Sequence, residues 1–235
     1  MKIRGFLKNG YNYSLNNNFK EARKEYSKVL EYEQNKIFKR LIITAKLNLY
    51  NTYHYDMINR QESLEYARIN EENFLKELPN YHDRKHLIFS WYKYQYALLC
   101  CNLGNTYNEL ALMRDAKNNY NSSKKYSLQA VDMFRKINKL NSYYFSIFGT
   151  TYSNLAITYR GLANLSKESS LLQLSLNYAK KSLLIFEEVK DCYNIARIQN
   201  SIGNIYNDLI NYKNNANKKE TFYSNKLLKQ IVRVL

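Results

Sequence analysis

One short phrase occurs twice in this chain. "NLGNTYNEL" at residues 102–110 returns as "SIGNIYNDL" at residues 201–209, with the glycine, the tyrosine and two asparagines at the same spacing. A partial third copy, "NLAITY", stands at residues 154–159. Similarity at several places along a chain indicates repeated structural units, each of which buries its apolar face against its neighbours. The phrase therefore predicts an extended array of similar units.

Composition favours α-helices as these units. The 235 residues include one proline and six glycines, whereas strands joined by tight turns need more of both. Segments 125–137 and 177–189 lie downstream of two copies of the phrase and superpose at the same offset as those copies, so each unit holds two helices. We therefore predict an all-α fold, a right-handed superhelix of about ten antiparallel helices arranged in pairs.

A pattern of small and bulky side chains in residues 6–30 supports this interpretation. The alternating bulky, small and aromatic positions are filled by Phe6, Gly10, Tyr13, Phe19, Ala22, Tyr26 and Val29. In this order the residues resemble the tetratricopeptide repeat (TPR) family, whose unit of about 34 residues is a helix, a turn and a second helix. The resemblance implies that the predicted superhelix is a TPR-like solenoid.

The resemblance covers residues 1–235 as a single domain. Two of the units are longer than the family's standard, with the surplus at residues 113–123 and around residues 164–170, and there we expect longer helices or ordered loops. The units are expected near residues 3–36, 40–78, 86–138 and 141–190, followed by a terminal pair of helices at residues 193–235.

The glycine of the phrase has a structural meaning within the family. Small residues at this position let the two helices of a unit approach each other closely. Gly104 and Gly203 are therefore expected to face a neighbouring helix, and leucine at either position is expected to wedge the helices apart. Tyr50 stands at this position in the second unit.

Polar side chains, mostly amides, follow one another on a second face of the helix expected at residues 194–209, and a mixed set that includes Cys101 and Ile157 stands at the same positions of the other units. In TPR arrays the corresponding positions line the concave groove, so the resemblance implies a groove that holds an extended peptide or protein tail. Asparagine can both donate to and accept from a peptide backbone, and arginine can hold an acidic side chain or a terminal carboxylate. The candidate ligand-binding residues are Asn51, Asn102, Asn105, Asn108, Asn154, Arg160, Arg197, Asn200, Asn204 and Asn207.

This groove face is expected to pack against nothing in the free protein, so its substitution should leave folding almost unchanged. Asparagine is abundant throughout the chain, and the same amides are equally consistent with an exposed surface that binds nothing. Long helices, divergent repeats and groove asparagines are also similar to the repeat domains of peptide-pheromone receptors of Gram-positive bacteria. That resemblance implies a non-catalytic peptide-binding module in signalling or regulation.

The chain departs from those receptors at its start. Repeat character begins by Phe6, so we expect neither the helix-turn-helix domain of the transcriptional receptors nor the helical bundle of the phosphatase receptors.

A net charge of +16 indicates acidic partners as a class. The alternative to peptide binding is therefore nucleic-acid binding, for which residues 91–107 offer interleaved aromatic side chains and Lys93. Trp91 and Tyr94 are three residues apart and continue toward Leu98, which is the spacing of a buried helix face. A self-assembling scaffold is a third class that the sequence leaves open.

Residues with catalytic or metal-binding potential are few. His82 and His86 have the spacing of metal ligands on a helix, but no third ligand stands at a suitable distance, and the segment starts at Pro79 as an inter-repeat turn would. Adjacent glutamates point to different helix faces, which suits solvation better than acid and base catalysis. These pairs are Glu71 with Glu72 and Glu187 with Glu188. We predict no catalytic residue, metal site or cofactor, and no enzymatic activity.

The compartment is inferred from cysteine content and hydropathy. Cys100, Cys101 and Cys192 are an odd number, and the adjacent pair lies in an apolar run, so small buried side chains are expected and a disulfide framework is not. No apolar run approaches the roughly 20 residues of a membrane span, and the first residues lack the apolar segment of a signal peptide. We predict a cytoplasmic protein with no membrane partner.

Overall fold

The computed structural model describes residues 2–34, 38–54, 60–77, 86–137 and 141–232. These residues form helices and no strand, which confirms the predicted all-α class. Nine helices make up the described parts of the chain: α1 (Lys2–Leu15), α2 (Phe19–Leu30), α3 (Lys39–His54), α4 (Arg60–Glu77), α5 (His86–Met113), α6 (Ala116–Arg135), α7 (Ser142–Ser166), α8 (Ser169–Glu188) and α9 (Cys192–Val232).

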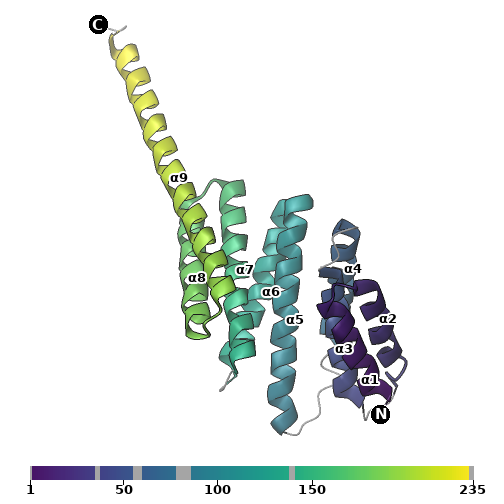
Figure 1. Cartoon of the computed structure of the whole chain (residues 1–235). Helices are drawn as coiled ribbons and strands as arrows, with labels where there is room; N and C mark the ends of the chain where they lie inside the picture. The colour runs from purple at the N-terminus through teal and green to yellow at the C-terminus, as the bar shows by residue number, and fades with distance from the viewer. Residues whose placement is uncertain (1, 35–37, 55–59, 78–85, 138–140, 233–235) are drawn as a thin grey trace.

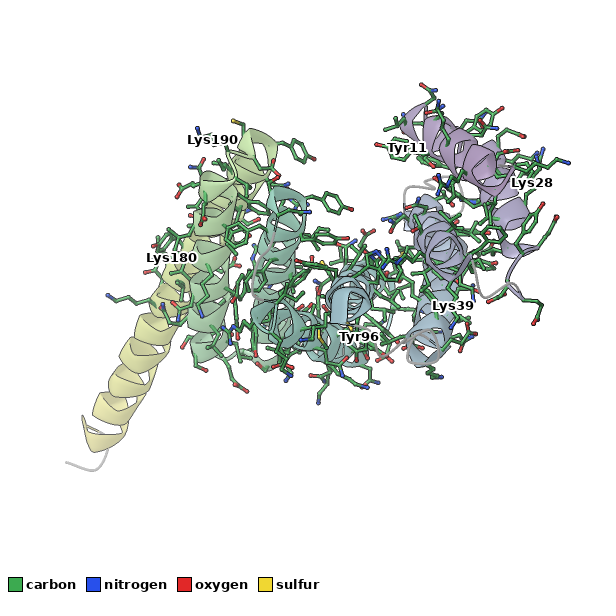
Figure 2. All side chains as sticks on the ribbon, turned by 90° about the horizontal axis from the view of Figure 1, so that it is seen from below. Tyr11, Lys28, Lys39, Tyr96, Lys180 and Lys190 are labelled. Atoms are coloured by element: carbon green, nitrogen blue, oxygen red, sulfur yellow. The ribbon has the colours of Figure 1, made fainter. Side chains whose placement is uncertain are left out.

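The helices follow one another in space in the order of the chain. The main packing contacts join consecutive helices, and two further contacts join α1 with α3 and α5 with α7. Figure 1 shows the helices side by side in one row, from α1 and α2 at one end to α8 and α9 at the other. Seen along the helix axes in Figure 2, the row is curved, and its open side lies between the α1 end and the α9 end.

Left-handed residues close the tight connections between helices. Asn17, Asp115, Lys167 and Lys190 have φ between 42° and 60° and stand between α1 and α2, α5 and α6, α7 and α8, and α8 and α9. Such a conformation costs a non-glycine residue roughly 1 kcal/mol, which the packing of the two long helices offsets. The described helical hairpins therefore turn at non-glycine residues, and none of the six glycines has a positive φ.

The extra residues of the two long units lengthen their helices. α5 has 28 residues and α7 has 25, and each is followed by a 20-residue helix after a short turn. Residues 116–123, which are rich in asparagine, lysine and serine, form the first two turns of α6 and not a loop. The expectation of longer helices is confirmed.

The predicted terminal pair of helices is wrong for the described residues. One continuous helix, α9, runs from Cys192 to Val232 and extends beyond its neighbours in Figure 1. A second helix would require a break near residue 211, and no glycine or proline follows Gly203. Asparagine and lysine in residues 211–219 lower helix propensity by only a few tenths of a kcal/mol each, so the helix continues.

Hydrophobic clusters between neighbouring helices make up the core. One cluster joins α2, α3, α4 and α5 through residues that include Tyr26, Ile43 and Phe74. Another joins α8 and α9 through Leu176 and Ile198 among others. Each helix pair thus buries its apolar side chains against the next pair, as expected of an array of repeated units.

Glycines stand where one helix meets a large side chain of the next. A β-carbon on Gly10 would lie 2.5 Å from the Tyr26 ring, and one on Gly161 would lie 2.2 Å from the Tyr120 ring. These are closer than van der Waals contact allows, so the two helix pairs α1/α2 and α6/α7 depend on glycine at these positions.

The two glycines of the repeated phrase differ from each other. A β-carbon on Gly104 would lie 2.3 Å from Ser127 Oγ of α6, as predicted. A β-carbon on Gly203 would have no described atom within 4 Å outside its own stretch of helix, and the residue is exposed. The expectation that Gly203 faces a neighbouring helix is therefore wrong, because α9 continues where the second helix of its unit was expected.

Candidate functional site

Several of the predicted ligand-binding asparagines connect odd-numbered helices to one another. Asn102 of α5 donates a hydrogen bond of 2.9 Å from Nδ2 to Oδ1 of Asn51 in α3. Asn154 of α7 donates from Nδ2 to the backbone carbonyl of Cys101 in α5 at 3.1 Å. These amides stabilise the array itself, since each bond spans two units.

Asn108 and Asn154 belong to a buried polar network with Ser123 and Thr158. Asn108 Nδ2 donates to the Asn154 carbonyl at 3.0 Å, and Thr158 Oγ1 lies 2.8 Å from Asn108 Oδ1 and 2.8 Å from Ser123 Oγ. Ser123 Oγ also lies 2.7 Å from the Gly104 carbonyl, so the network joins α5, α6 and α7. Asn108 and Asn154 are each 3% exposed, which contradicts the expectation that these two face an open groove.

Arg160 takes part in an ion pair between α7 and α9. Its Nε lies 2.6 Å from Asp208 Oδ2, and the two side chains are 36% and 23% exposed. Close by, the Tyr212 hydroxyl donates to the Ala163 carbonyl at 3.3 Å. The guanidinium thus already holds one carboxylate of this chain, so a ligand carboxylate would share it with Asp208.

The remaining candidates lie on the accessible surface. Asn51, Asn105 and Asn204 are partly buried, whereas three residues of α9 are exposed. These three are Arg197, Asn200 and Asn207. Some of the predicted amides therefore bond neighbouring helices and others are open to solvent, and Asn51 does both, because its Oδ1 accepts from Asn102 while the residue stays partly exposed.

One equivalent position stays accessible on each of the five odd-numbered helices. It is the residue directly after the glycine position of each unit, where Gly10, Tyr50, Gly104, Ala156 and Gly203 stand. We call these residues the accessible row: Tyr11, Asn51, Asn105, Ile157 and Asn204. Tyr11 is 55% exposed and Ile157 is 40% exposed, and the three amides are partly exposed.

Tyr11 and Ile157 were not among the predicted site residues. Neither side chain is an amide, although both residues follow the glycine position as Asn105 does. Figure 2 places Tyr11 on α1 at the open side of the curved row. The signal that identifies them is their place in the repeat and not their chemistry.

Charges of both signs flank the accessible row. Asn105 Nδ2 donates to Glu109 Oε1 at 3.1 Å, and Glu109 is ion-paired with Arg60 of α4. Together with the pair of Arg160 and Asp208, this arrangement leaves the row close to neutral despite the net charge of +16. An uncharged or mixed peptide suits such a surface as well as an acidic one does.

Glu71 and Glu72 are integrated into the fold, so their expected solvation is wrong. Glu71 is fully buried, with the Thr106 hydroxyl 3.3 Å from its Oε2. Glu72 accepts hydrogen bonds from the hydroxyls of Tyr107, at 2.5 Å, and Tyr126, at 3.0 Å. The carboxylate thereby joins α4, α5 and α6. Glu187 and Glu188, by contrast, are exposed as expected.

Stability is expected to fall at alkaline pH because the hydroxyls of Tyr107 and Tyr126 donate to Glu72. Burial, reinforced by the Glu72 carboxylate, raises the pKa of Tyr107 to about 12, and burial also raises the pKa of Tyr126. An unfolded tyrosine ionises near pH 10, so the stabilisation by the neutral hydroxyls is complete below pH 10 and is lost as pH rises toward 12.

Urea titrations from neutral to alkaline pH measure this effect. Tyr107→Phe should make the alkaline decline shallower, and Tyr193→Phe, at an exposed tyrosine, should leave the pH profile as in the native chain. A profile that is equally steep in both variants would contradict the assignment to Tyr107.

Aromatic residues of the segment considered for nucleic acid contact other parts of the fold. Tyr94 stacks on Tyr144 of α7 with ring centroids 4.2 Å apart. Trp91 packs beside the first hydrophobic cluster, and the Arg40 guanidinium lies 5.6 Å from its ring centroid. The side chains of His82 and His86 lie outside the described residues. Among the side chains that are described, no three His, Cys, Asp or Glu residues gather as a metal site would require.

The described surface has two hollows, and the first includes Arg60, the ion-pair partner of Glu109 beside the accessible row. One of about 520 Å³ is polar and includes Arg60, Glu65 and Arg114. The other, of about 290 Å³, lies between α6, α7 and the start of α8, and its lining includes Lys124 and Leu162.

No protein-family model matches the chain, and no curated protein matches it. In the described parts of the chain, no helix combines the length and the apolar character needed to cross a membrane.

Proposed function

We propose that the chain is a TPR-like, non-catalytic binding module that holds an extended peptide or protein tail along the accessible row. The single observation that carries the proposal is the row itself, one solvent-accessible side chain at the same repeat position on α1, α3, α5, α7 and α9. Repeat arrays present extended surfaces of this kind, on which each unit contributes one contact to a linear ligand.

Chemistry along the row suits an extended backbone. Asn51, Asn105 and Asn204 can each donate to a peptide carbonyl and accept from a peptide N–H. Tyr11 and Ile157 supply apolar contacts for ligand side chains between these polar positions. By analogy with the receptors whose repeat domains the sequence resembles, we assign this binding a role in regulation or signalling.

Replacing two amides of the row should weaken peptide binding while the fold persists. Each amide-to-backbone pair contributes about 1 kcal/mol, so Asn105→Ala together with Asn204→Ala should raise the dissociation constant by roughly 30-fold. The measurement is a peptide array with the purified protein, followed by fluorescence titration of the best peptide against the native chain and the variant.

A matched control lies on the outer surface of α8. Gln173 and Asn177 are exposed amides on the helical stripe of Lys180, which points away from the open side in Figure 2. The double alanine variant of this pair should bind peptide like the native chain. Equal loss in both double variants would refute the accessible row, and tight binding of single-stranded nucleic acid at physiological salt would favour the nucleic-acid alternative instead.

A further inference from the structure

Helix α9 repeats the phrase of α5 but lacks the neighbour that α5 has on its glycine side. In α5, Gly104 faces Ser127 of α6, and Tyr107, three residues on, is 7% exposed. In α9, no described atom lies within 4 Å of a β-carbon on Gly203, and Tyr206 is 44% exposed. The glycine side of α9 is therefore built like a helix-packing surface, yet no helix of the described chain covers it.

This side of α9 is uncharged over four helical turns. At 100° per residue, the positions that flank Gly203 on the same side include Ala196, Gln199, Tyr206, Asn207 and Ile210, all of them exposed. Of the charged residues between Cys192 and Asn214, Arg197 and Asp208 fall on other sides of the helix, and Lys213 lies at the edge of this side, beyond Ile210. An exposed, uncharged stripe is unusual for a chain with a net charge of +16. It is the surface on which two equally charged copies repel each other least.

We propose that the glycine side of α9 is a dimerisation face, on which α9 of a second copy packs antiparallel across a two-fold axis at Gly203. The face is self-complementary about that residue. Ala196 lies seven residues before Gly203 and Ile210 seven residues after it, which is close to two turns in each direction. Antiparallel packing sets the small Ala196 of one copy against the large Ile210 of the other, and the two-fold axis repeats the contact.

Two amide side chains on this face are also placed symmetrically about Gly203. Gln199 and Asn207 lie four residues on either side of Gly203, so the amide of one copy meets the amide of the other and can both donate and accept. Asn207 stands at the position of Asn108, which in α5 donates to the backbone carbonyl of a neighbouring helix. Glycine at the crossing point removes the side chain that would hold the two backbones apart.

The oligomeric state tests the proposal directly. Sedimentation equilibrium of the native chain should show a monomer and dimer in a concentration-dependent ratio. Gly203→Arg places an unpaired guanidinium at the two-fold axis and should raise the dimer dissociation constant at least about 100-fold. Gly5→Arg is the matched control, because Gly5 is also a helical, exposed glycine with no described atom within 4 Å of a β-carbon, and it should dimerise like the native chain.

Folding does not confound this comparison. Arginine has a higher helix propensity than glycine, so α9 should remain helical in Gly203→Arg, as circular dichroism can verify. A native chain that stays monomeric at all concentrations would overturn the proposal. A dimer that Gly203→Arg leaves intact would overturn it as well, since the contact would then lie elsewhere.

Disulfide cross-linking tests the antiparallel register. In a Cys192→Ser background, the only other cysteines are buried Cys100 and Cys101. Ala196→Cys and Ile210→Cys variants should form a mixed disulfide when combined and oxidised, and neither should cross-link efficiently by itself. Efficient cross-linking of Ala196→Cys alone would indicate parallel helices and refute the register. Neither experiment requires a peptide ligand, so the result is independent of the peptide binding proposed along the accessible row.

Discussion

Leucine in place of Gly104 is expected to lower the free energy of unfolding by about 3 kcal/mol, and leucine in place of Gly203 is expected to lower it not at all. The β-carbon at Gly104 would lie 2.3 Å from Ser127 Oγ, and the remaining leucine atoms would force α5 and α6 apart. Gly203 has open space at the same position of the repeated phrase. Because leucine favours a helix more than glycine does, Gly203→Leu should be neutral or stabilising by up to about 1 kcal/mol.

Urea denaturation of both variants, followed by circular dichroism, gives the two free energies of unfolding. The measurement is made at the lowest usable protein concentration, so that self-association through α9 does not contribute to stability. Similar losses in the two variants would mean that Gly203 also packs against a helix. In that case the uncovered face of α9, and the dimer proposed on it, would both be wrong.

Repeats and composition were sufficient to predict the helical class and the order of packing. The phrase at residues 102–110 and its copies located the glycine positions, and at Gly104 the predicted helix contact is present. Scarcity of glycine and proline predicted helices, and the left-handed conformations of Asp115 and Lys167 show how the chain turns without glycine. These features are local, so a sequence can reveal them.

The end of the array could not be predicted in the same way. A copy of the phrase in α9 implied a partner helix for Gly203, because the earlier copy in α5 has one. Whether a helix breaks after residue 210 depends on small propensity differences over residues 211–219, set against the packing that a second helix would gain. That balance is not visible in the repeated phrase itself.

Only part of the candidate site could be predicted from residue type. Asparagine can bind a ligand backbone, but it can equally well bond to the backbone of the next helix, and Asn154 does so at the Cys101 carbonyl. The two roles need the same side chain, so burial is what separates them: Asn108 is 3% exposed, whereas Asn105 is partly accessible. Burial of a polar helix face depends on how closely α5 and α7 approach, which spacing along one helix does not reveal.

Alanine in place of Asn108 is expected to destabilise the fold, and alanine in place of Asn207 is expected to leave it unchanged. The two asparagines occupy the same place in the repeated phrase. Asn108 donates to the Asn154 carbonyl at 3.0 Å, and its Oδ1 lies 2.8 Å from the Thr158 hydroxyl, all within a buried network. Removing one member of such a network leaves buried polar groups unpaired and costs about 1–3 kcal/mol, whereas an exposed substitution costs less than about 0.5 kcal/mol.

A double-mutant cycle shows whether the loss comes from the network or from the cavity alone. Thr158→Val removes the hydroxyl that bonds to Asn108 and keeps a similar volume, so combining it with Asn108→Ala should cost less than the two single losses added together. Simple additivity would mean that the two side chains act independently. If Asn108→Ala were as harmless as Asn207→Ala, Asn108 would be an accessible amide, as the repeated phrase predicts, and it would be a candidate for peptide binding again.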